Sequence, residues 1–183
     1  MKKGVKMREK KESNQPIAIS DSEIIQKLYR MGAIPNIVEN VVVPPVLAAY
    51  LSERGVIGTP EDAKKIIAEQ MKKDPLAEDK LIIVRYLWSR GYVCRMSNEV
   101  SDGEGDSAPA FNFIRVHQKG LRAGEDRTKY VVLVVPKEWT IDLKGINKLF
   151  EASGKLRKEL ILAYVYGNDN AVKFIRIGRA TFE

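Results

Sequence analysis

The sequence predicts an α+β or α/β fold in two parts, a small and mainly helical N-terminal domain over residues 17–73 and a mixed-sheet domain over residues 76–183. Two patterns favour this division. Apolar residues in the first part follow capping residues at helical spacing, whereas the second part alternates helical stretches with β-branched runs. A polar break at 72–75 separates the two. A chain of 183 residues is long enough for two small domains packed together.

The N-terminal part begins with a capped helix. Ser20 and Glu23 have the spacing of a capping box, and Gly32 suits the residue that follows the helix. A short β-branched run at 41–43 predicts a minor strand. The next helix is predicted over residues 46–54, because a proline pair precedes it and a glycine follows it.

Two more helices lie on either side of the polar break. Thr59 is a suitable cap and Pro60 suits a first helical turn, so a helix is predicted over residues 63–72. Residues 76–90 also have helical spacing and end at Gly91.

Strands dominate the remainder of the chain. The run at 129–135 is apolar enough to be a central strand covered on both faces. A terminal hairpin is predicted from two β-rich runs joined by Gly167, Asn168, Asp169 and Asn170. The predicted elements of this part are strands at 92–96, 111–117 and 129–135, a helix within 140–158, and strands at 160–166 and 172–177.

The composition limits the class of protein. With 44% hydrophobic and 30% charged residues, we expect a soluble globular protein. No apolar window approaches the length of a membrane span, and residues 1–12 lack the apolar centre of a signal peptide, so we expect the cytoplasm. Cys94 is predicted to be a buried, inert side chain. The acidic loop within 97–110 lacks the EF-hand pattern, and with a single histidine the chain is expected to use no metal and no cofactor.

Positive charge is concentrated at the N-terminus. The net charge is +7, and residues 1–12 hold six basic and two acidic side chains. The leader at 1–16 is either a disordered aid to solubility or an arm that contacts RNA phosphates, and both alternatives stay open. A second basic cluster, Lys155, Arg157 and Lys158, is a candidate for binding RNA phosphate.

Four segments together identify a family. They read YLWSRGYV at 86–93, FIRVH at 113–117, KYVVLVV at 129–135 and LRKELILA at 156–163. In order and spacing they resemble the C-terminal domain of archaeal tRNA-splicing endonucleases, over about residues 76–178. The resemblance implies a tRNA-intron-endonuclease fold, like that of restriction endonucleases, behind a helical N-terminal segment.

The resemblance also implies three catalytic positions. Active members cleave precursor tRNA at bulge-helix-bulge junctions without a metal and leave a 2′,3′-cyclic phosphate and a 5′-hydroxyl. They use a tyrosine base, a histidine acid and a lysine that stabilises the transition state. Those positions hold His117 (or Val116, if the strand is shifted by one), Arg127 and Lys158 in this chain. Only Lys158 matches, and the position of an arginine that grips bulged bases holds Glu151.

These departures predict a non-catalytic structural subunit of a crenarchaeal-type heterotetramer, with a catalytic subunit and precursor tRNA as partners. The resemblance implies that the last strand pairs with a partner's sheet and that the preceding loop inserts into the other type of subunit. One alternative is an active chain with His117 as base and Lys158 assisting, and another is a stand-alone basic RNA-binding module. The implied interface residues are Gly167, Asn168, Asp169, Asn170, Val172, Phe174 and Arg176.

Overall fold

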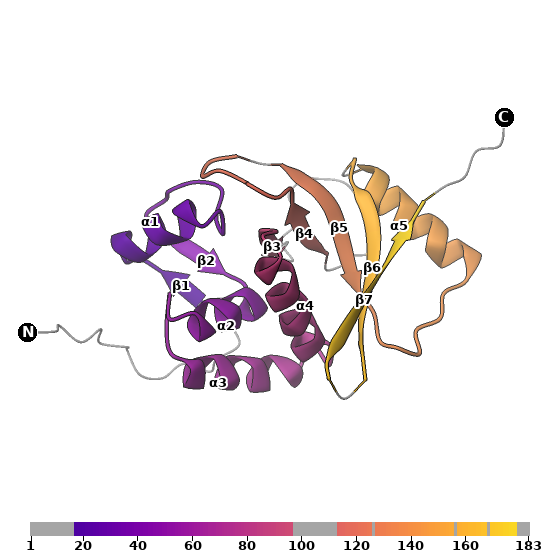
Figure 1. The fold of residues 1–183 in the computed structure, drawn as a ribbon, viewed down its shortest axis with the longest axis horizontal. Helices are drawn as coiled ribbons and strands as arrows, with labels where there is room; N and C mark the ends of the chain where they lie inside the picture. The colour runs from indigo at the N-terminus through magenta and orange to yellow at the C-terminus, as the bar shows by residue number, and fades with distance from the viewer. Residues whose placement is uncertain (1–16, 97–112, 126, 156, 168, 179–183) are drawn as a thin grey trace, which may run out of the picture.

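The computed structural model describes a mixed α/β protein (Figure 1). Its described residues form five helices, a two-stranded sheet and a five-stranded mixed sheet. The predicted leader at 1–16 and the acidic loop within 97–110 lie outside this described part. The described ranges are 17–96, 113–125, 127–155, 157–167 and 169–178.

The N-terminal elements are three helices beside an antiparallel strand pair. The predicted strand at 41–43 and the three predicted helices are confirmed, with helix boundaries that differ by a few residues. These elements are β1 (Ile17–Ile19), α1 (Ser22–Arg30), β2 (Val41–Val43), α2 (Pro45–Glu53) and α3 (Pro60–Met71).

The predicted cap of α1 is wrong by one residue. The cap is Asp21 rather than Ser20, and its carboxylate accepts the backbone N–H groups of Glu23 at 2.9 Å and Ile24 at 3.1 Å. A single carboxylate therefore satisfies two donors of the first turn, and the helix begins without a bond from the Ser20 hydroxyl.

The C-terminal elements build the large sheet. Strands β5 and β6 are parallel and joined through α5, and every other neighbouring pair is antiparallel. The sheet order is β3-β4-β5-β6-β7, which leaves β7 at one edge. The elements are α4 (Ala77–Ser89), β3 (Cys94–Met96), β4 (Ile114–His117), β5 (Thr128–Val134), α5 (Leu143–Lys155), β6 (Glu159–Tyr166) and β7 (Ala171–Ile177).

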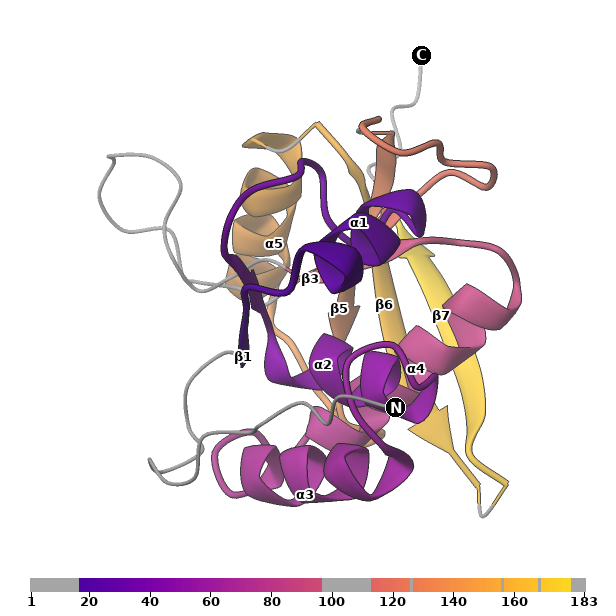
Figure 2. The same ribbon diagram turned by 90° about the vertical axis from the view of Figure 1, so that its left-hand side faces the viewer.

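Helices cover both faces of the sheet (Figures 1 and 2). Helix α4 and the N-terminal elements lie on one side, and α5 lies on the other. The prediction of a central strand covered on both faces is confirmed for β5, in which Val131 and Val132 are buried. The terminal hairpin is confirmed as well.

The apolar core continues across the predicted domain boundary. One cluster contains residues of α1, α2 and α3 together with residues of α4, β4, β5 and β6. At the polar break, the Asp74 carboxylate accepts the Leu76 N–H at 3.0 Å and pairs with the Lys80 ammonium at 2.6 Å. Lys80 is only 6% exposed. The break is therefore a fixed junction, and the division into two domains stays a prediction.

Cys94 is fully buried in β3, as predicted, and burial raises the pKa of its thiol far above the usual value. None of the described helices is long and apolar enough to cross a membrane.

Candidate nucleic-acid interface

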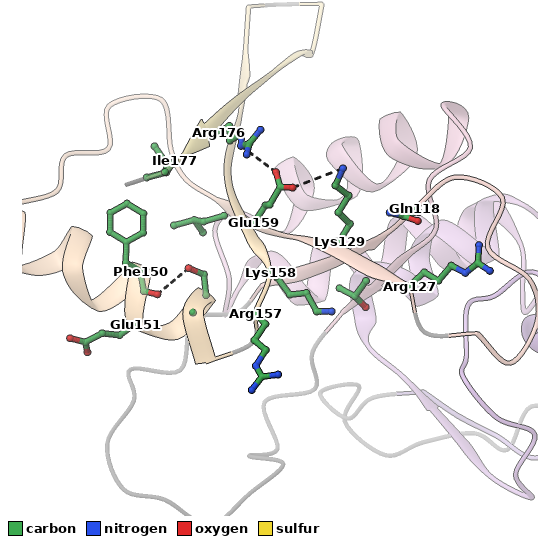
Figure 3. A pocket seen from close by; sticks show the side chains of 15 residues that line it. Gln118, Arg127, Lys129, Phe150, Glu151, Arg157, Lys158, Glu159, Arg176 and Ile177 are labelled. Carbon is green, nitrogen blue, oxygen red and sulfur yellow. Dashed lines mark hydrogen bonds and ion pairs between the residues drawn. The ribbon is translucent and has the colours of Figure 1, made fainter. Parts of the chain in front are cut away.

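A cavity of about 1100 Å³ opens between the end of α5 and the adjacent end of the sheet (Figure 3). We call it the basic cavity, because its lining brings cations together from three separate segments. Two carboxylates, Glu151 and Glu159, also line it. The cationic side chains are Arg127, Lys129, Arg157, Lys158 and Arg176.

The end of α5 positions Lys158. The Arg157 N–H donates to the Gly154 carbonyl at 2.9 Å and the Lys158 N–H donates to the Ser153 carbonyl at 3.2 Å, which is the bonding pattern of a Schellman motif. Arg157 has a φ of 51°, in the left-handed region where glycine is usual. In the described part of the chain, no carboxylate pairs with Arg157 or Lys158. Both cations are therefore available to an anion.

Three side chains form an ion triad across neighbouring strands. The Glu159 carboxylate lies 3.2 Å from Arg176 Nε and 3.9 Å from Lys129 Nζ (Figure 3). The register places Glu159 opposite Tyr130, the residue after Lys129. Tyr130 and then Glu159 raise the pKa of Lys129 above its usual value, so this lysine stays cationic at neutral pH.

Arg127 and His117, at the other two catalytic positions that the resemblance implies, differ in whether they line the basic cavity. Arg127 lines the basic cavity, and its guanidinium pairs with Glu125 at 3.0 Å. His117 is 1% exposed and is not part of the cavity lining. Its ring lies behind Thr128, whose hydroxyl is 3.4 Å from Nδ1. A bulge between Val116 and His117 shifts the pairing with β5, and which of the two residues stands at the tyrosine position stays a prediction.

The implied interface residues fall into two groups. Gly167, Asp169 and Asn170 are exposed at the hairpin tip, where Asn168 lies outside the described residues. On β7, Val172 packs against the core, Phe174 is 36% exposed, and Arg176 belongs to the ion triad. The side chain of Lys155 is likewise outside the described part.

The arrangement suits phosphate binding. Arginine and lysine bind phosphate oxygens through charge-assisted hydrogen bonds, and cations held by few carboxylates retain that capacity. Sequence reasoning found Arg127, Arg157 and Lys158 but assigned no cavity role to Lys129 or Arg176. Lys129 and Arg176 come together only through the register of the strands. Because they are far apart in the chain, no short stretch of sequence predicts that they meet. Among the described residues, no group of His, Cys, Asp and Glu is placed to hold a metal ion.

Comparison with known proteins supports the family inferred from the four segments. No family model matches the chain. The chain is 25% identical to the "tRNA-splicing endonuclease" of Nanoarchaeum equitans over 77% of its own length and 90% of that protein. It is 24% identical to the protein of the same name from Thermococcus kodakarensis (84% of this chain, 87% of the relative) and to that from Thermococcus onnurineus (87% and 90%). These archaeal relatives match most of both chains.

Proposed function

We propose that this chain is a non-catalytic structural subunit of a tRNA-splicing endonuclease. It supports the cleavage of precursor tRNA at bulge-helix-bulge junctions by a catalytic subunit within a heterotetramer. The observation that carries this proposal is the position of His117, the sole histidine of the chain, which is buried outside the cavity that holds Lys158 and Arg127.

The chemistry of the cavity supports a binding role. Cleavage to a cyclic phosphate requires a base at the ribose 2′-hydroxyl and an acid at the leaving oxygen, both within hydrogen-bond reach. A guanidinium such as that of Arg127 is a poor proton donor, and the buried ring of His117 does not line the cavity. Lys158 and its neighbouring cations hold phosphate without transferring a proton, so the proton transfers fall to the partner.

The edge of the sheet is the surface that we assign to the partner. Strand β7 ends the sheet order, and its Ile175 side chain, which is not part of any described hollow, is 47% exposed. An edge strand with exposed apolar side chains is an aggregation hazard unless another strand or element covers it. We assign pairing with a partner's sheet to β7, and insertion into the other subunit to the hairpin tip at 167–170.

A reconstitution experiment tests the proposal. A bulge-helix-bulge precursor RNA is incubated with this protein, with a catalytic subunit from the same genome that retains the tyrosine, histidine and lysine, and with both proteins mixed. We expect cleavage only in the mixture, with 2′,3′-cyclic phosphate and 5′-hydroxyl ends. Cleavage by this chain alone would make it the active subunit, and RNA binding without any effect on the catalytic subunit would favour a stand-alone RNA-binding module.

A further inference from the structure

A second hollow lies on the opposite face of the sheet, where the end of α4 meets β5, β6 and β7. We call it the aromatic groove. It encloses about 370 Å³, and its floor is formed by core side chains such as Leu87 and Val132. Tyr86 is 38% exposed and Phe174 is 36% exposed at its rim. The aromatic rings that line it are those of Tyr86, Tyr92, Tyr130 and Phe174.

Flexible cations lie over three of these rings. Arg90 Cζ is 5.3 Å from the centre of the Tyr86 ring, and Lys119 Nζ is 5.0 Å from that of Tyr92. Lys129 Nζ is 5.1 Å from the Tyr130 ring. Long cationic side chains are held only weakly over aromatic faces at exposed sites, so a planar group with stronger stacking displaces them.

We infer that the aromatic groove binds an unpaired nucleotide of RNA, with its base stacked on Tyr86 and its phosphate held by the cations of the rim. Every base has a flat π-face that stacks on aromatic side chains, and the groove offers several rings above an apolar floor. The inference deepens the proposed function, on which it rests for the choice of precursor tRNA as the physiological RNA.

The charges of the groove select RNA over an apolar protein segment. Lys129 and Arg176 line the groove with a single carboxylate, Glu159, which they already neutralise. Arg90 and Lys119 add two exposed cations beside the rings. An apolar peptide would leave this positive charge without a partner, whereas a nucleotide provides a base for the rings and a phosphate for the cations.

The groove and the basic cavity share a wall. The ion triad of Lys129, Glu159 and Arg176 lines both hollows. We assign the next phosphate of the strand to the triad, because its cations line both the groove and the basic cavity. The two hollows form one track for a single strand that passes over the end of the sheet.

The test uses the full-length protein and a fluorescein-labelled, single-stranded oligoadenylate, with affinity measured by fluorescence anisotropy. Tyr86→Leu removes the ring but keeps an apolar, helix-forming side chain, and Tyr86→Phe is the matched control that keeps the ring. We expect Tyr86→Leu to raise the Kd by about fivefold or more, and Tyr86→Phe to change it by less than about twofold. For an abasic oligonucleotide of the same length, the two variants should bind equally.

Three results would overturn the inference. They are an absence of wild-type binding to oligoadenylate, equal oligoadenylate affinities for Tyr86→Leu and Tyr86→Phe, and a Tyr86→Leu defect that persists with the abasic strand. If Tyr86→Leu changed the sedimenting mass of the protein but not its RNA affinity, the groove would be assigned to a protein partner instead. The binding assay needs no catalytic subunit, so its result remains valid if the reconstitution experiment fails. A failed binding assay would likewise leave the result of the reconstitution experiment valid.

Discussion

The two faces of the five-stranded sheet are packed to very different extents. On the α4 face, a continuous apolar cluster runs from Ile19 through α2 and α4 to Ala163. On the α5 face, the buried members of the cluster within the described residues are Phe113, Val131, Leu149 and Leu160. The difference indicates that the α4 face supplies most of the stability, while the lightly packed end of α5 leaves room for the basic cavity.

The largest expected effect is the loss of stability when a buried side chain is shortened, and this loss should differ between the two faces of the sheet. Ile83 is fully buried in α4, and we expect Ile83→Ala to lower the free energy of unfolding by about 4 kcal/mol, because it leaves a cavity amid tightly packed neighbours. Leu149→Ala in α5 should cost only about 2 kcal/mol, because fewer buried groups surround Leu149. Urea unfolding measures both values. A larger loss for Leu149→Ala would reverse the assignment of the stabilising face.

The second-largest loss of stability is expected at the junction before α4. Asp74→Ala leaves the ammonium of Lys80 buried and unpaired, so we expect a loss of about 3 kcal/mol in thermal or urea unfolding. The control is Glu69→Ala, which breaks an exposed pair with Lys72 at the end of α3 and should cost no more than about 0.5 kcal/mol. Equal losses for the two variants would show that the Asp74 pair acts as a surface pair.

The smallest effect on stability is expected at the N-terminal cap of α3, whose contribution depends on pH. Thr59 donates its N–H to the Asp62 carboxylate at 3.0 Å and its hydroxyl at 2.8 Å, which lowers the pKa of Asp62 in the folded protein. The ionised carboxylate therefore stabilises the fold above the unfolded pKa, and this contribution disappears as pH falls through the folded pKa. The difference in urea midpoint between wild type and Asp62→Asn should shrink below about pH 4. A difference that grows on acidification would contradict the assigned direction.

Local signals were sufficient to predict most elements. Thr59 caps α3 as the sequence predicts, and the apolar run at 131–135 lies largely in the central strand. The α1 cap was missed because Asp21 and Ser20 are both good caps, and only the backbone geometry decides which side chain faces the first turn.

The candidate site could be predicted only in part, and from the resemblance to a family rather than from local sequence patterns. Lys158 and Arg127 were found by resemblance to a family, and both line the basic cavity. The burial of His117 follows from the bulge in β4, and the meeting of Lys129 with Arg176 follows from register across three strands. Register depends on contacts between distant residues, so no short window of sequence contains it.

In the function that we propose, this chain binds RNA and positions its partner without transferring protons. The most direct measurement is the single-turnover cleavage rate constant of the mixed assembly, at saturating protein, with His117→Ala or His117→Gln in this chain and folding checked by circular dichroism. We expect rate constants within about twofold of wild type, because the ring is buried outside the basic cavity. A fall of about a hundredfold in both folded variants, the effect of losing a general acid or base, would contradict it.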